Sequence, residues 1–252
     1  MGRHRGAAVA LAAGALLLTA GPASAETTQP AASAAATAAT VHVPDDFVPA
    51  LSDTRATGHY AVQGTGLHLS TEGATRTDKV AEYVATTTPL ATAGEPSLEF
   101  ANTSGGGVPG TQLVVDFDAD GKTDGILVGE ELYGDDWWVN DAAAQFVRDR
   151  APVQGGGSGS TNHGTLDQWR AAFPGAQVKA FGFSLGSGVK GDGVLDAIDF
   201  AGTRYTFAAP VVLTSKEQCK KGGWATSTRP VFADQSECVS SFGGPKRPVP
   251  AI

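Results

Sequence analysis

Short segments rich in β-branched and aromatic residues recur between residues 58 and 213, and Gly, Pro, Asn or Ser follows each within a few positions. In the first, HYAVQGTGLHLST, the side chains of Tyr60, Val62, Leu67 and Leu69 share one face of an extended chain. Short strands at such spacing, separated by turn residues, are typical of a β-sandwich or barrel. The sequence therefore predicts an all-β domain over residues 41–209.

Two short helices are expected to interrupt the strands. In TLDQWRAAFPG, Thr165 and Gln168 have the spacing of a capping box, and Pro174 should end the helix. The segment NDAAAQFVRD, residues 140–149, gives a weaker second helix. Further strands are expected in DKVAEYVATTTPL, SLEFA (with Leu98 and Phe100 on one face), TQLVVDFD, GILVGE, QVKAFGFSL, VLDAIDF and TRYTFAAPVVL.

The first 25 residues have the three parts of a secretory signal peptide. Arg3 and Arg5 supply the positive start, AAVALAAGALLLTA the apolar core and ASA the cleavage site. The apolar run is too short for a membrane span, and no later stretch is apolar enough to be one. Residues 26–40, which are rich in Ala and Thr, are expected to be a linker. The sequence therefore predicts a secreted, extracellular protein.

The net negative charge of the chain disfavours anionic binding partners. The full chain has 18 Lys and Arg against 26 Asp and Glu. Removing residues 1–25 removes two Arg, and 16 minus 26 leaves a net charge of −10. Such an acidic protein is a poor partner for nucleic acid or for an anionic membrane surface.

Residues 210–252 are expected to form a separate, small segment that ends in a Pro-rich tail. It holds the only two cysteines, Cys219 and Cys238. In an oxidising compartment this even count predicts one disulfide, and a pair of free thiols is the alternative. Ser215 with Gln218, and Asp234 with Glu237, have capping-box spacing, so the disulfide would join two helical turns.

The stretch DFDADGKTDG, residues 116–125, is the candidate metal site. Its aspartates occupy positions 1, 3, 5 and 9 of a calcium-type loop, and a glycine occupies position 6. An EF-hand is rejected because position 12 is Leu127 rather than Glu. A shorter calcium loop between two strands and a hairpin turn with solvated carboxylates both remain open. The candidate ligands are Asp116, Asp118, Asp120, Asp124 and the carbonyl of Lys122.

Trp137 and Trp138 are the candidate ligand-binding residues. On a strand, adjacent side chains point to opposite faces, so one ring should enter the core while the other meets solvent. An exposed Trp can stack on a sugar ring. The alternative is that both rings are covered, because large aromatic side chains are usually mostly buried.

Several patterns resemble catalytic motifs, but each lacks a residue or element that the motif requires. GFSLG around Ser184 has no helix after it and no His later in the chain, so a serine hydrolase elbow is excluded. GSGVKG also lacks a following helix and is expected to be a loop between strands. The histidines do not have zinc-ligand spacing. No catalytic residue is assigned, although a hydrolase could draw on Glu130, Glu131, Asp135 and Asp136.

Residues 58–207 resemble a group of uncharacterised secreted actinobacterial proteins. The stretches that carry the resemblance are LVVDFDADGKTDGILVGEELYGDDWW, GTLDQWRAAFP and AFGFSLGSGVKGDGVLDAIDFAGTRYTF. It implies a jelly-roll-like antiparallel sandwich similar to lectin and carbohydrate-binding folds. We therefore expect a non-catalytic protein that binds glycan or cell envelope, with calcium as a candidate cofactor. The alternatives are an extracellular polysaccharide hydrolase and an interaction protein without a small ligand.

Overall fold

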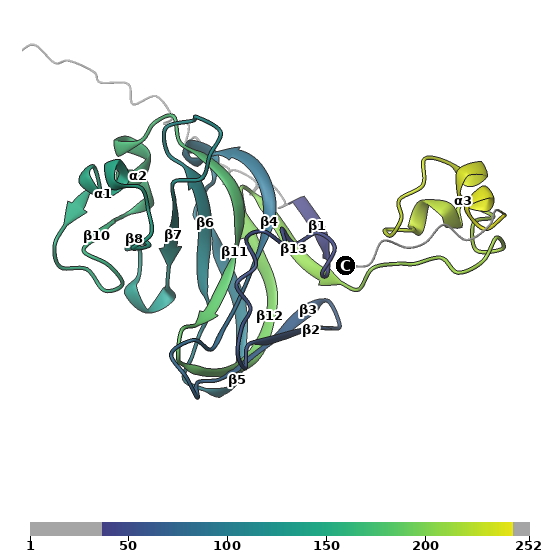
Figure 1. The fold of residues 1–252 in the computed structure, drawn as a ribbon, viewed down its shortest axis with the longest axis horizontal. Helices are drawn as coiled ribbons and strands as arrows, with labels where there is room; N and C mark the ends of the chain where they lie inside the picture. Colours follow the sequence, from purple (N-terminus) through teal and green to yellow (C-terminus); the bar gives the residue numbers. More distant parts are fainter. Residues whose placement is uncertain (1–36, 244–252) are drawn as a thin grey trace, which may run out of the picture. The chain divides into compact units, whose positions relative to one another are not determined.

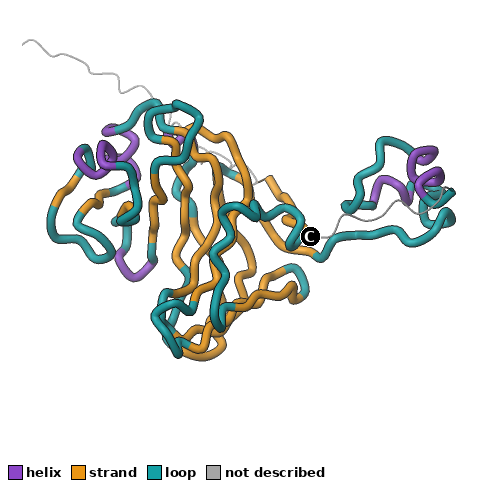
Figure 2. Tube along the Cα trace, in the orientation of Figure 1, coloured by secondary structure: helices purple, strands orange, loops and turns teal. Residues whose placement is uncertain are grey.

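Two β-sheets make up most of the structure, a computed structural model that describes residues 37–243 (Figures 1 and 2). The first sheet has the strand order β1–β13–β12–β3–β2, and β5 pairs with the opposite side of β12. Its strands are β1 (Thr37–His42), β2 (His59–Gln63), β3 (Gly66–Glu72), β5 (Ser97–Gly105), β12 (Lys190–Phe200) and β13 (Thr203–Ala208).

The second sheet has the order β4–β11–β6–β7–β8–β10–β9. Its pairs are all antiparallel, whereas β1 and β13 of the first sheet run parallel. The predicted all-β sandwich is confirmed. The strands are β4 (Lys79–Pro89), β6 (Gly110–Asp116), β7 (Gly125–Gly129), β8 (Trp137–Val139), β9 (Val153–Gln154), β10 (Asn162–Gly164) and β11 (Gln177–Gly186).

The core lies between the two sheets, where β3 faces β4, β12 faces β11 and β5 faces β6. Leu67 and Leu69 are fully buried on the face predicted from the sequence. Phe181 of the second sheet stacks on Phe200 of the first, with 4.3 Å between the ring centroids. Burying one such side chain contributes about 1.5–3 kcal/mol, so this layer is the main source of stability.

The second sheet continues past β5, and two helices lie beside this extension (Figure 1). They are α1 (Gln145–Asp149) and α2 (Leu166–Ala172). The predicted capping box of α2 is present, since Thr165 and Gln168 each accept a hydrogen bond from the other's backbone N–H. Trp169 on α2 is fully buried, and its Nε1 donates to the carbonyl of Trp137 at 3.0 Å. The helix therefore covers β8 where the first sheet does not.

Two boundaries differ from the sequence-based expectation. Residues 140–144 form turns, and α1 begins only at Gln145, because the Asn140 side chain accepts from the Ile126 amide. Residues 37–40, predicted as linker, belong to β1, because β13 offers a row of backbone partners to this polar segment. The predicted signal peptide, linker residues 26–36 and tail residues 244–252 lie outside the described residues.

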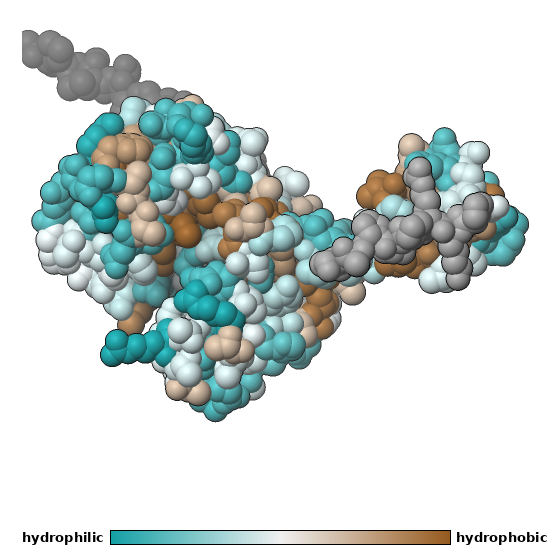
Figure 3. Space-filling view, viewed as in Figure 1, coloured by the Kyte–Doolittle hydropathy of each residue, from teal (hydrophilic) through white to brown (hydrophobic). Residues whose placement is uncertain are grey.

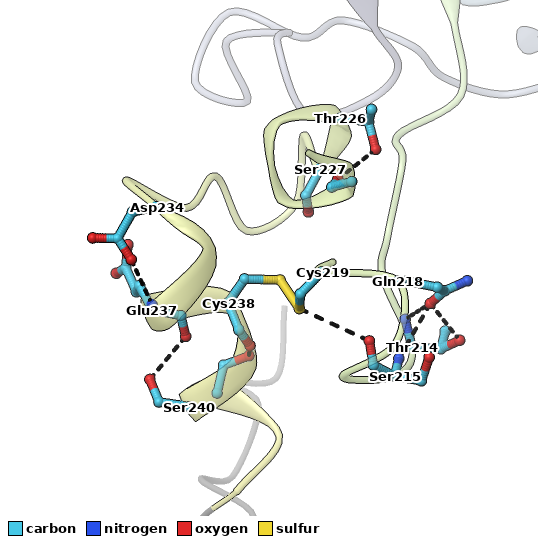
Figure 4. Close-up of a disulfide and its surroundings, with 12 residues drawn as sticks. Thr214, Ser215, Gln218, Cys219, Thr226, Ser227, Asp234, Glu237, Cys238 and Ser240 are labelled. Atoms are coloured by element: carbon cyan, nitrogen blue, oxygen red, sulfur yellow. Dashed lines mark hydrogen bonds between the residues drawn. A yellow bond between two sulfur atoms is a disulfide. The ribbon is translucent and has the colours of Figure 1, made fainter. Parts of the chain in front are cut away.

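The C-terminal segment has its own small core around the predicted disulfide. Cys219 and Cys238 are bonded (Figure 4). Both are fully buried, and they pack with Phe232. Cys238 lies on α3 (Gln235–Ser241), which Asp234 caps by accepting from the Glu237 amide at 2.8 Å. Residues 215–222 form successive turns without a regular helix, in which the amides of Gln218, Cys219 and Lys220 each donate to the carbonyl three residues earlier.

A buried carboxylate joins the loops before β2, after β3 and before β4. Asp78 is fully buried and has no ion-pair partner among residues 37–243. It accepts hydrogen bonds from Thr57 Oγ1 at 2.7 Å, Thr75 Oγ1 at 2.7 Å and the Ala74 amide at 2.8 Å. The hydroxyl donors of Thr57 and Thr75 lower the pKa of Asp78 to about 2.

Replacing Asp78 with Asn should destabilise the sandwich at neutral pH, because the amide nitrogen cannot accept from the surrounding donors. Since the folded pKa lies below the unfolded value of about 3.9, the stabilisation by Asp78 is present above that value. It is lost as the pH falls through about 2. Thermal melts from pH 7 to pH 2 should therefore show a shrinking difference between wild type and Asp78→Asn. The exposed Asp141→Asn is the control, and a difference that stays constant with pH would contradict this role.

Removing the disulfide should unfold the C-terminal segment and leave the sandwich folded, because the two have separate hydrophobic clusters. On the chain-entropy model, closing a loop of this length contributes about 3 kcal/mol. Limited proteolysis of the double variant Cys219→Ser, Cys238→Ser should cut within residues 210–243 and spare residues 41–209. Equal protease resistance of the segment in both proteins would refute the prediction.

Candidate functional site

A groove of about 630 Å³ lies where the second sheet continues past β5. One wall is β5 and the chain before it, and the other is β7, β8 and the turn between them. The start of α2 closes one end. The groove is lined by residues 95–98, Phe100, residues 108–109, Thr111, residues 129–131, 134–135, Trp137 and residues 165–167.

The apolar part of the groove follows from strand alternation. Leu98 and Phe100 on β5 point inward and are half-buried, whereas Glu99 between them is exposed. Gly129 lets the Trp137 ring lie against β7, because a Cβ there would be 2.7 Å from the ring. The groove therefore has both apolar and polar walls. Figure 3 shows one face of the molecule, on which hydrophobic residues (brown) lie in the middle and hydrophilic residues (teal) lie around them.

The groove is also strongly acidic. Five of its lining residues are carboxylates, and no lysine, arginine or histidine lines it. Glu130 is the most enclosed of those without an ion pair; burial raises its pKa, and a hydrogen bond from Trp138 opposes this rise. The carboxylates are Glu95, Glu130, Glu131, Asp135 and Asp167.

Of the four carboxylates considered for a hydrolase, the structure brings three to this groove and diverts the fourth. Asp136 Oδ1 lies 2.8 Å from His163 Nδ1, so it ties β8 to β10 instead of lining the groove. Its hydrogen bond raises the pKa of His163. Asp136 therefore has a cationic partner, whereas Glu131 and Asp135 form no ion pair among the described residues, and the Glu130 side chain lies on the face of the sheet that carries Trp138.

Neither ring of the tryptophan pair is freely exposed. Trp137 is only 5% exposed and meets the groove with its edge. Trp138 points to the opposite face and is half-buried under the loop that contains Gly159, where a Cβ would lie 2.1 Å from its ring. Its Nε1 is buried and makes no well-aligned hydrogen bond in residues 37–243, but it lies close enough to the Glu130 carboxyl to lower the pKa of that group. Trp137 is buried and Trp138 half-buried, which fits the alternative that both rings are covered, and Trp138 does not line the groove.

The aspartate loop brings together three of its predicted ligands. Carboxylate oxygens of Asp116, Asp118 and Asp120 all lie within 4.8 Å of one another. Asp116 is buried at the end of β6, and its two oxygens accept from the amides of Asp120 at 3.2 Å and Gly121 at 2.9 Å. The other two aspartates are exposed.

Of the remaining two predicted ligands, Asp124 has another partner, and the carbonyl of Lys122 stays a prediction. Asp124 lies outside the group of three, and its Oδ2 accepts from the Phe117 amide at 2.7 Å. Burial raises the pKa of Asp124, and the neighbouring aspartates add to this. The Lys122 ammonium lies 3.0 Å from Asp120 Oδ2. The donor set that fits a hard cation is therefore three carboxylates, because oxygen ligands are what calcium takes.

The structure gives neither GFSLG nor GSGVKG the geometry of a catalytic or phosphate-binding motif. Ser184 lies inside β11 rather than on a turn, opposite Ala81 and Gly110 of the neighbouring strands. GSGVKG is the connection between β11 and β12, as expected. Neither segment presents a nucleophile or a phosphate cradle.

Comparison with known proteins adds no functional assignment. No family model matches the chain, and no curated protein or solved structure is significantly similar to it. The resemblance to secreted actinobacterial sandwiches thus stays a prediction. Within residues 37–243, no helix has the length and apolarity that a membrane crossing requires.

Sequence reasoning missed two carboxylates that line the groove and the arginine behind them that pairs with both. Glu95, Asp167 and Arg170 meet near one end of the groove, where Arg170 Nη1 lies 2.8 Å from Glu95 and 2.7 Å from Asp167. The spacing of Asp167 and Arg170 on a predicted helix could have indicated their pairing. Glu95 is 75 residues from Arg170, so no local pattern signals that contact.

Proposed function

We propose that the protein is a secreted, non-catalytic β-sandwich that binds a glycan chain of the cell envelope in the groove between β5 and β8. The observation that supports this most is the groove's composition: apolar walls from Leu98, Phe100 and Trp137 next to carboxylates and hydroxyls. Sugars present both apolar C–H faces and hydroxyl donors, so they match such a lining. The signal-peptide pattern and the disulfide are consistent with an extracellular protein.

A polysaccharide hydrolase is the second candidate, and one observation favours it. Glu130, at the edge of the groove that Glu131 and Asp135 line, is a half-buried carboxyl with a raised pKa. A raised pKa suits a general acid, and a glycosidase pairs one with a second carboxylate. We rank it below binding because the other two carboxylates are exposed and no donor group orients them.

Binding should be measured on a panel of polysaccharides, with release of reducing ends followed in the same samples. Phe100→Ala should weaken binding roughly tenfold, because it removes the half-buried ring from the groove. Phe146→Ala, which removes a half-buried ring elsewhere, is the control. Equal affinity of both variants would contradict the site. Turnover that is lost in Glu130→Gln would instead establish the hydrolase.

We also propose that Asp116, Asp118 and Asp120 hold a calcium ion that stabilises the sandwich. An ion bound only by the folded loop raises the free energy of unfolding by about 2.7 kcal/mol at a hundred times its dissociation constant. Asp118→Ala should remove most of this increase, because it removes one of three ligands.

The calcium proposal is tested by melting wild type, Asp118→Ala and the control Asp141→Ala in chelator and in millimolar calcium. Wild type and the control should melt at higher temperature in calcium, and Asp118→Ala should not. Identical melting of wild type in calcium and in sodium chloride of equal ionic strength would identify a solvated hairpin turn.

A further inference from the structure

A glycine-rich loop, residues 155–161, joins β9 to β10 and lies across the rings of Trp138 and His163. His163 on β10 is directly paired with Trp138 on β8, so the two side chains share one face of the sheet. A Cβ on Gly159 would lie 2.1 Å from the Trp138 ring, and one on Gly157 would lie 2.7 Å from the His163 ring. The backbone of the loop is therefore in direct contact with both rings.

His163 is the side chain that fixes this loop from outside. The loop is closed by its own backbone, where the Gly155 amide donates to the Thr161 carbonyl at 2.7 Å. Among the described residues, the one side chain outside the loop that hydrogen-bonds to it is His163, whose Nε2 lies 3.2 Å from the Gly155 carbonyl. Glycine loses more conformational freedom on ordering than any other residue, and residues 155–157 are all glycine. The position of the loop therefore depends on this contact.

Both ring nitrogens of His163 face hydrogen-bond acceptors. Nδ1 lies 2.8 Å from Asp136 Oδ1, and Nε2 lies 3.2 Å from the carbonyl oxygen of Gly155. A neutral imidazole has one N–H and can donate to only one of these oxygens, whereas the imidazolium donates to both. Since the carboxylate is the stronger acceptor, the neutral ring keeps its proton on Nδ1 and turns the Nε2 lone pair toward the carbonyl. Protonation of His163 thus decides whether the loop is bound or repelled.

The charged group that controls the protonation of His163 is Asp136. The hydrogen bond with Asp136 raises the pKa of His163 more than burial lowers it, and the carbonyl of the loop adds to the rise. Neither β9 nor the loop has a titratable side chain. Of the other carboxyls near β8, Asp135 lines the groove and Glu130 lies next to the Trp138 indole.

We propose that the loop of residues 155–161 is a pH-dependent cover of Trp138: protonated His163 holds the loop on the ring, and loss of this proton releases it. Release exposes the ring surface that Gly159 covers, beside the Glu130 carboxyl. Because the pKa of His163 is raised above 6.5, the contact is complete below that value and is lost as the pH rises through the folded pKa. Trp138 does not line the groove, so the cover is independent of the proposed glycan binding.

The test follows the accessibility of Trp138 on the mature chain between pH 5.5 and pH 9. Acrylamide is uncharged and quenches only the rings that it reaches, and lifetimes give its rate constant of quenching. The contribution of Trp138 is the difference between wild type and Trp138→Phe. This rate constant should rise with pH in one transition, with a midpoint above 6.5. The imidazole resonances of His163 in NMR spectra should titrate with the same midpoint.

Two variants assign the transition to the His163–Asp136 pair. His163→Gln should lose the pH dependence, because an amide does not titrate. Asp136→Asn should keep a transition but move its midpoint to lower pH, because the carboxylate that raises the pKa of His163 is gone. An unchanged midpoint in Asp136→Asn would overturn the proposal, even if His163→Gln failed to fold.

Two control variants exclude other titrating groups. His68→Gln is the matched control, because it removes a histidine that lies 3.3 Å from Asp192 on the other sheet, and it should keep the transition. Glu130→Gln should also keep it, although Glu130 lies beside the indole. A transition that is lost in Glu130→Gln but persists in His163→Gln would overturn the proposal. So would quenching of Trp138 that stays constant with pH, or that is stronger at low pH.

Discussion

The two sheets are offset, so that part of the second sheet has no strand of the first sheet opposite it. The first sheet ends at β5, which faces β6, while the second sheet continues through β7, β8, β10 and β9. The uncovered part of a sheet would expose its apolar face to water. Helix α2 covers one portion with Trp169 and Phe173, and the portion that stays open is the groove. The core and the candidate site therefore have the same origin.

The sequence was sufficient for the parts of the fold that local rules decide. Alternation identified Leu67 and Leu69 as inward-facing, and the spacing of Thr165 and Gln168 identified the start of α2. These features depend on interactions between residues a few positions apart, so they can be predicted from the sequence alone. The disulfide was predicted by elimination, since Cys219 and Cys238 are the only cysteines.

The sequence was not sufficient where partners come from distant strands. β1 is a strand because β13, more than 150 residues later, offers backbone partners to a polar Ala/Thr segment. The groove combines residues between Glu95 and Asp167, and strand order decides which of them meet. Of the carboxylates in GEELYGDD, Asp136 is diverted by His163, which lies 27 residues away. Only the register of β8 on β10 makes that contact.

For Trp137 and Trp138, strand alternation predicts the direction of each side chain correctly but not how much of each ring is exposed to solvent. Alternation correctly placed Trp137 and Trp138 on opposite faces of β8. Which face meets solvent was decided by a glycine-rich loop, because Gly159 packs against the Trp138 ring. Such a loop has no periodicity from which its position could be read. The aromatic contribution to the groove thus comes from Phe100 on the facing sheet and from the edge of Trp137.

Electrostatics separates the groove from the generally acidic surface of the protein. Elsewhere, many exposed carboxylates have a nearby cation: Glu99 pairs with Arg204, and Glu72 with Lys190 at 2.9 Å. Such exposed pairs contribute little stability, but they leave little free charge. Around η2, Glu131 and Asp135 have no such partner in the described chain, but both are exposed to water, which screens their charge. The half-buried Glu130 carboxyl instead has the Trp138 indole as a hydrogen-bond donor, which opposes the rise of its pKa through burial. Folding therefore leaves the unpaired charge of this turn where water can solvate it.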